Sequence, residues 1–85
     1  MKTIKDQLFY SVIGFKDITK MATFYKDGYI KKGNAQRIAR SLISKGYEQV
    51  VLRRENIWLR NENNEFSNSI AIEKYTNNGM MLLKV

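Results

Sequence analysis

The 85-residue sequence contains no cysteine, no histidine and no proline. Without cysteine the chain can form neither a disulfide nor a cysteine-ligated zinc site, so packing alone must stabilise it. Small secreted domains usually depend on disulfides, and their absence therefore favours a cytoplasmic protein. Without proline no linker is marked, and we expect one domain over residues 1–85.

The missing histidine and cysteine also bear on catalysis. General acid-base and nucleophilic mechanisms near neutral pH draw mainly on these residue types, and no other catalytic motif replaces them. Two acids in the polar loop, Glu62 and Glu65, are too few to fill the oxygen shell of a divalent cation. We therefore expect no enzyme activity, no cofactor and no metal site. No apolar run approaches the ~20 residues of a membrane span.

Positive charge is concentrated in the middle of the chain. The formal net charge is +7, and eleven cations but only four acids lie between Lys16 and Arg60, so this segment holds the whole excess. Lys, Asn and Ile, which AT-only codons can encode, supply 27 residues. This composition points to an AT-rich genome such as that of a phage, plasmid or prophage.

An amphipathic helix is predicted from about residue 35 to residue 45. Its apolar residues recur at i, i+3, i+4, i+7 and i+8: Ala35, Ile38, Ala39, Leu42 and Ile43. Asn34 is the expected N-cap, and Gly46 is the expected left-handed residue after the helix.

The period changes to two after this helix. Strands are predicted for residues 48–54 and 57–61, joined by a turn at Glu55-Asn56, and for residues 70–76 and 80–84. An Asn78-Gly79 type I′ turn would join the last two strands and set Tyr75 opposite Leu82.

Residues 3–27 fit either strands or helices. Asp27-Gly28, between residues that favour strands, predicts a hairpin. The alternative is a helix that begins at Asp17 and ends at Gly28, with another that begins near Thr3. We favour strands over residues 21–31, because Thr23, Phe24 and Tyr25 fit a pleated surface.

The expected fold class is therefore α+β, with one helix packed on an antiparallel sheet in the order hairpin, helix, strands. The helix, Gly46-Tyr47, strand, turn, strand segment also resembles the second half of a winged helix. That similarity covers about a third of the chain and carries no specific motif. A winged-helix-like fold is the alternative.

The outer face of the predicted helix is the candidate site. Between Gly28 and Tyr47 the chain has no acid and five cations: Lys31, Lys32, Arg37, Arg40 and Lys45. Any half-buried helix has a polar outer face, so a solvated surface is the competing interpretation. However, Lys31, Lys32 and Arg37 lie near the helix N-terminus, where the helix dipole favours anions. A bound phosphate would make this placement favourable.

Two function hypotheses follow. The first is a non-catalytic nucleic-acid-binding accessory or regulatory protein, for DNA or RNA. Its five helix cations would contact phosphates, Gln36 and Arg40 would reach base edges, and Arg53, Arg54 and Arg60 around the predicted Glu55-Asn56 turn would form a second contact. Four or five phosphate contacts predict a slope of log K against log salt of roughly −3 to −5. The second is a small inhibitor or adaptor of the anti-defence type that binds an acidic host protein or a nucleoprotein.

Overall fold

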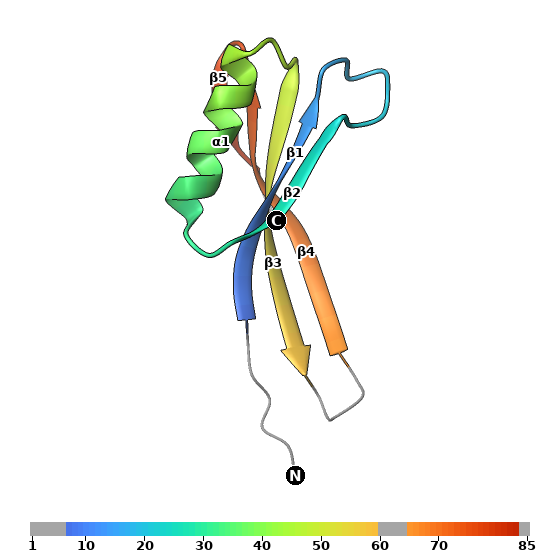
Figure 1. Ribbon diagram of the computed structural model, residues 1–85, viewed down its shortest axis with the longest axis vertical. Coiled ribbons are helices and arrows are strands. Elements are labelled where there is room, and N and C mark those ends of the chain that lie inside the picture. The colour runs from blue at the N-terminus through green and yellow to red at the C-terminus, as the bar shows by residue number, and fades with distance from the viewer. Residues whose placement is uncertain (1–6, 60–64, 84–85) are drawn as a thin grey trace.

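One α-helix lies on one face of a five-stranded antiparallel sheet in the computed structural model, which describes residues 7–59 and 65–83 (Figure 1). The elements are β1 (Gln7–Phe15), β2 (Phe24–Tyr29), α1 (Lys32–Ser44), β3 (Gln49–Leu59), β4 (Glu65–Thr76) and β5 (Gly79–Leu82). The strand order in the sheet is β2-β1-β3-β4-β5. The predicted α+β class and element order are confirmed. The winged-helix-like alternative is wrong, because α1 is the one helix in the described part of the chain.

β2 confirms the strand interpretation, but Asp27-Gly28 is not a turn. Both residues lie inside β2, which pairs with β1 across the connection at residues 16–23. The pairing shifts between Tyr10, opposite Tyr29, and Val12, opposite Lys26. Gly28, with φ +88°, lies in this irregularity, where the lack of a Cβ makes a positive φ accessible. The alternative helix from Asp17 is wrong, since residues 17–20 form a tight turn closed by the Lys20 N–H and the Asp17 carbonyl.

β3 continues through the predicted turn at Glu55-Asn56. Glu55 pairs with Phe9 of β1 on one side and with Ser69 of β4 on the other. A turn here would leave backbone groups in the middle of the sheet unpaired, so pairing on both sides favours an extended chain. The predicted turn is therefore wrong, and Arg53 and Arg54 lie within a central strand.

The β4–β5 hairpin is confirmed with a different turn. Thr76 pairs with Gly79, so the turn residues are Asn77 and Asn78, and Tyr75 lies opposite Met80 instead of Leu82. Gly79 has φ +121°, whereas no residue other than glycine has a positive φ in the described chain. A type I′ turn would force Asn78 to a positive φ, and glycine adopts such angles at lower cost.

α1 begins at Lys32, three residues before the predicted start. Its N-cap is Lys31, whose backbone is extended and whose side chain makes no capping hydrogen bond, so the prediction of Asn34 as N-cap is wrong. The predicted C-terminal end is confirmed. Gly46 has φ +103°, and the Tyr47 N–H donates to the Leu42 carbonyl at 3.0 Å, as in a Schellman motif.

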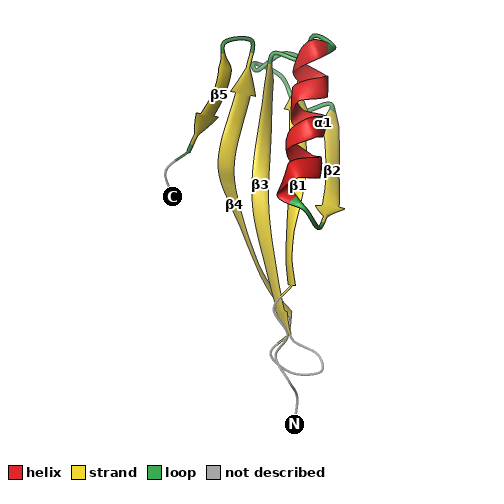
Figure 2. Ribbon diagram, turned by 90° about the vertical axis from the view of Figure 1, so that its left-hand side faces the viewer, coloured by secondary structure: helices red, strands yellow, loops and turns green. Residues whose placement is uncertain are grey.

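The core lies between α1 and the central strands. Two small helix residues, Ala35 and Ala39, are fully buried and let the helix approach the sheet closely. With Leu42 they pack on a set of strand residues, none more than 5% exposed: Val12, Val50, Leu52 and Tyr75. Burial of each large side chain contributes about 1.5–3 kcal/mol. The helix covers the β1 and β3 side of one sheet face, whereas β5 lies at the far edge (Figure 2).

Candidate nucleic-acid interface

Four predicted site residues lie exposed along α1. Arg37 and Arg40 are on the side of the helix opposite Ala35 and Ala39, because residues three or four apart share a face. Lys45 follows the last helical residue, and the N-cap lysine precedes the first. We call this set the cationic face of α1, and it consists of Lys31, Arg37, Arg40 and Lys45. In the described residues none of the four forms an ion pair with an acid.

Lys32 and Gln36 turn instead toward the sheet. The Lys32 Nζ lies 3.1 Å from the Glu73 Oε2, and the Gln36 Nε2 donates to both Glu73 oxygens at 3.1 Å. The Tyr75 hydroxyl donates to the Glu73 Oε1 at 2.7 Å. The expected role of Gln36 at base edges therefore does not fit this structure, because its amide donor is engaged. Lys32, although its side chain is 43% exposed, is neutralised in the same way.

Glu73 explains why these side chains are held. Its side chain is 2% exposed, and a carboxylate buried there requires partners. Burial would raise the Glu73 pKa, but hydrogen bonds from Tyr75 and Gln36, together with Lys32, hold the pKa below its usual value. Burial and the hydrogen bond to Glu73 raise the pKa of Tyr75. The network thus ties the first two turns of α1 to β4.

The sequence contains a signal for this network. Glu73 and Tyr75 alternate with Lys74 and Thr76, and period-two spacing places Glu73 on the same sheet face as Tyr75. An acid on a core-facing position indicates a nearby cation or donor.

The N-terminus of α1 lacks compensating negative charge. Its first turn contains no acid, the N-cap is a lysine, and Gly33 and Asn34 are exposed. The Asn34 N–H donates to the Lys31 carbonyl at 3.1 Å, and the Lys31 side chain makes no capping hydrogen bond. Cations near this end of a helix are unfavourable by a few tenths of a kcal/mol to ~1 kcal/mol.

Arg53 and Arg54 do not extend the cationic face of α1. Arg53 lies opposite Ser11, next to the fully buried Val12, so it points to the sheet face away from the helix. Its Nε donates to the Ser69 Oγ at 2.8 Å. Arg54 lies opposite Tyr10, on the helix side of the sheet, and is partly buried. Arg60, the ninth predicted residue, lies outside the described residues.

The helix-free sheet face carries a polar cluster instead. The Ser11 Oγ donates to the Glu55 Oε2 at 2.7 Å, and the Tyr25 hydroxyl donates to the Asp27 Oδ2 at 3.2 Å. Burial, with the nearby acids Glu55 and Asp27, raises the pKa of Tyr25. Among the described residues, acids and Arg53 are mixed on this face, so they give no excess of one charge comparable to that of α1.

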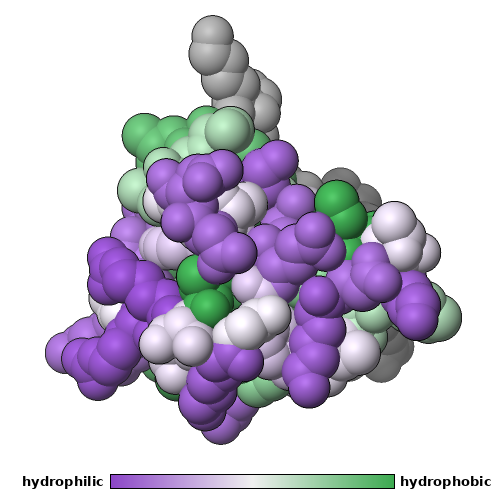
Figure 3. Space-filling view, turned by 90° about the horizontal axis from the view of Figure 1, so that it is seen from above, coloured by the Kyte–Doolittle hydropathy of each residue, from purple (hydrophilic) through white to green (hydrophobic). Residues whose placement is uncertain are grey.

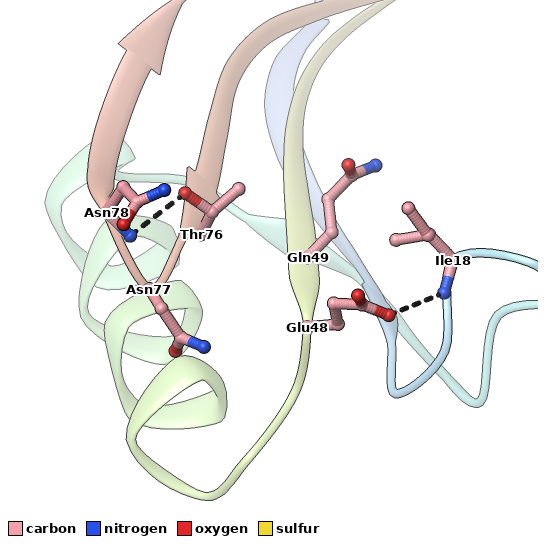
Figure 4. Close-up of a pocket in the computed structure, with 6 residues that line it drawn as sticks. All are labelled: Ile18, Glu48, Gln49, Thr76, Asn77 and Asn78. Carbon is pink, nitrogen blue, oxygen red and sulfur yellow. Dashed lines mark hydrogen bonds between the residues drawn. The ribbon is translucent and has the colours of Figure 1, made fainter.

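A shallow pocket of about 280 Å³ opens at the end of the sheet (Figure 4). It lies between the β1–β2 connection and the β4–β5 turn, and its lining residues are Ile18, Glu48, Gln49, Thr76, Asn77 and Asn78. The Glu48 Oε1 accepts from the Ile18 N–H at 3.0 Å, and the Thr76 Oγ1 accepts from the Asn78 N–H at 3.1 Å. The pocket holds one carboxylate and no cation.

The surface at this end is mainly hydrophilic. Seen from above, hydrophilic side chains cover most of it, and hydrophobic surface gathers mainly at one edge (Figure 3).

Within residues 7–59 and 65–83 no group of three acids gathers as a metal-binding cluster. The 13-residue helix α1 is too short to cross a membrane, and no other helix occurs in the described chain.

The arrangement therefore offers an exposed cationic face along one helix. Comparison with protein-family models, with curated proteins and with solved structures found no match to this chain.

Proposed function

We propose that this protein is a non-catalytic nucleic-acid-binding accessory or regulatory factor of a phage, plasmid or prophage, active in the cytoplasm. The cationic face of α1 would hold the phosphates. One observation carries the proposal: four exposed cations follow one helix without a paired acid in the described residues. Such a face attracts polyanions and releases their counterions on binding.

The length of this face suits a backbone of repeated phosphates. From Lys31 to Lys45 the chain advances 14 residues, or about 21 Å at 1.5 Å per residue. Duplex DNA carries one charge per ~1.7 Å of its axis, so several phosphates fall within reach. The exposed residues Gly33, Asn34 and Ser44 between the cations are small, and they let a phosphate backbone approach the helix closely.

The proposed binding is largely independent of sequence. Phosphate contacts position a protein on nucleic acid, whereas base-edge contacts specify a sequence. Gln36, the expected base-reading residue, is hydrogen-bonded to Glu73, which leaves Arg40 as the remaining predicted contact to a base edge. We therefore expect modest differences in affinity between oligonucleotides of different sequence.

Charge reversal with a matched control tests the proposal. The double variant Arg37→Glu, Arg40→Glu removes two central contacts, and Lys16→Glu, Lys20→Glu reverses two exposed lysines on the β1–β2 connection. Each reversal changes the charge by 2, so both variants fall from +7 to +3. Fluorescence anisotropy with a labelled duplex and a labelled single strand should show a loss of at least about tenfold for the first variant and much less for the control.

Equal losses in the two variants would mean that net charge alone drives the binding, and the site on α1 would be wrong. If the wild-type protein fails to bind either oligonucleotide at low salt, the nucleic-acid function is wrong. The inhibitor hypothesis, with an acidic protein as partner, would then be the one to test.

A further inference from the structure

A pocket of about 170 Å³ opens between α1 and the β4–β5 hairpin. The helix packs on β4 but not on β5, which leaves this space open beside the first residues of β5. The pocket is smaller than the roughly 300–1,000 Å³ of sites for drug-sized ligands, so it suits one small group. Each of the three elements supplies two lining residues: Arg40, Ile43, Tyr75, Thr76, Gly79 and Met80.

Most of the pocket surface is apolar. Met80 is 47% exposed and lies opposite Tyr75, on the side of the sheet that carries α1. Two polar groups of the lining already have partners. The Tyr75 hydroxyl donates to the Glu73 Oε1 at 2.7 Å, and the Thr76 Oγ1 accepts from the Asn78 N–H at 3.1 Å. The pocket therefore offers apolar surface and few groups that could recognise the polar edge of a ligand.

Arg40 joins this pocket to the cationic face of α1. It lines the pocket, and it is also one of the four exposed cations that form no ion pair in the described residues. A long cationic side chain can pack its methylene stem on apolar surface while its head group stays in water. An anion held by the Arg40 guanidinium would therefore lie next to the pocket.

We propose that this pocket holds one unpaired nucleobase of a single strand whose phosphates lie on the cationic face of α1, an inference that rests on the proposed function. A nucleotide joins a flat base to a phosphate through one sugar, so a phosphate on Arg40 brings a base to the pocket. Guanidinium groups stack on the faces of bases, and methionine sulfur makes favourable contacts with aromatic rings. Arg40 and Met80 would supply these contacts.

Charge and shape together select this occupant. An uncharged apolar ligand would leave Arg40 and the other cations of α1 without a partner, whereas a strand of nucleic acid matches both the cations and the apolar pocket. The base of a duplex is stacked on its neighbours and must be extruded before it can enter a pocket, which costs free energy. Single-stranded or locally unpaired nucleic acid is therefore the expected substrate class.

Fluorescence anisotropy with three oligonucleotides of equal length and mixed sequence tests the inference. They are a single strand, the same strand with abasic residues, and a duplex. The wild type should bind the base-bearing strand more tightly than the abasic strand, which keeps its phosphates but offers no base to the pocket.

Met80→Ser removes an apolar wall of the pocket without changing the charge. It should weaken binding to the base-bearing strand about 2- to 10-fold and leave binding to the abasic strand and the duplex unchanged. Met81→Ser is the matched control, since Met81 is 56% exposed on the same strand but lies opposite Lys74, on the other face of the sheet. It should bind all three oligonucleotides like the wild type.

Methyl NMR of the wild-type protein locates the base without relying on a variant. The chain has four methionines, so labelling of their methyl groups gives few signals. The base-bearing strand should shift the Met80 methyl signal through the ring current of the bound base, and the abasic strand should not. The signals of Met21 and Met81, which lie outside the pocket lining, should stay in place.

The outcomes separate the pocket from the phosphate site. Equal binding of the base-bearing and abasic strands, an unmoved Met80 signal, or equal losses in Met80→Ser and Met81→Ser would each overturn the inference and leave the proposed function standing. If no oligonucleotide binds at low salt, the proposed function fails and the inference fails with it. A shift of the Met80 signal by an acidic peptide that contains phenylalanine would then identify a protein as the occupant.

Discussion

Lys31 should lower folding stability and strengthen nucleic-acid binding. Replacing it with aspartate should therefore raise stability and weaken binding. Lys31 has φ −107° and ψ 130°, the extended backbone of an N-cap residue, so aspartate fits without rearrangement. Its carboxylate would accept from the N–H of Gly33 or Asn34, the second and third helical residues. The substitution thus adds a capping bond and reverses the charge at the positive end of the helix dipole.

The capping bond and the charge reversal each contribute a known amount to the free energy of unfolding. A capping side chain contributes about 1 kcal/mol, and a charge of suitable sign near a helix terminus contributes about 0.3–1 kcal/mol. Together they predict a stabilisation of about 1–2 kcal/mol. For a domain of this size each kcal/mol raises Tm by ~4–8 °C, so Lys31→Asp should melt at least about 5 °C above the wild type.

Thermal unfolding followed by circular dichroism, with Lys20→Asp as control, measures this effect. Lys20 is exposed on the β1–β2 connection, and its substitution changes the net charge equally without adding a helix cap. In parallel, Lys31→Asp should lose one phosphate contact, which lowers the steepness of the salt dependence by about 1. The reasoning is refuted if Lys31→Asp is no more stable than Lys20→Asp, or if it binds nucleic acid as well as the wild type.

Three further predictions concern the core. Glu73→Gln should destabilise the protein by about 1–3 kcal/mol in urea unfolding, because the new amide donor would face the donors of Gln36 and Lys32. The substitution should also release Lys32 and make the salt dependence of nucleic-acid binding steeper. The pKa of Glu73 is lowered in the folded state, so its ionised form contributes to folding stability above the unfolded pKa of about 4.3, and this contribution is lost as pH falls through the folded pKa. The difference in stability between wild type and Glu73→Gln should therefore shrink on acidification below about pH 4. A constant difference would contradict the assigned network. Gly14→Ala should cost about 1–3 kcal/mol, because its Cβ would lie 3.0 Å from the Tyr47 ring, and an unchanged urea midpoint would show that the ring moves aside freely.

Elements that depend on local pattern were predictable from the sequence. The 3.6-residue spacing of Ala35, Ala39 and Leu42 gave the buried helix face, and Gly46 gave the helix end. Period-two spacing gave β4 and the hairpin that follows it. These signals act over a few residues, so long-range pairing does not change them.

Pairing across the sheet was not predictable in the same way. Asp27-Gly28 and Glu55-Asn56 both favour turns locally, yet both lie within strands. β1 pairs with the residues on either side of the first pair, and both neighbours of β3 pair with the second. The gain from completing a five-stranded ladder exceeds a local turn preference, which is worth only a fraction of a kcal/mol to ~1 kcal/mol per residue.

The candidate site was predictable only in part, because some of its contacts depend on long-range packing. Helical spacing correctly placed Arg37 and Arg40 on the exposed face. The engagement of Lys32 and Gln36 depends on Glu73, which is 37 residues from Gln36 in sequence, and only the packing of α1 on β4 brings them together.

The salt dependence of nucleic-acid affinity tests the central claim most directly. With Lys32 neutralised by Glu73, four cations remain on the cationic face of α1, and ~0.9 counterion released per contact predicts a slope of log K against log salt of about −3 to −4 for duplex DNA. A slope near zero, or no binding at low salt, would contradict the claim that this helix face binds phosphates.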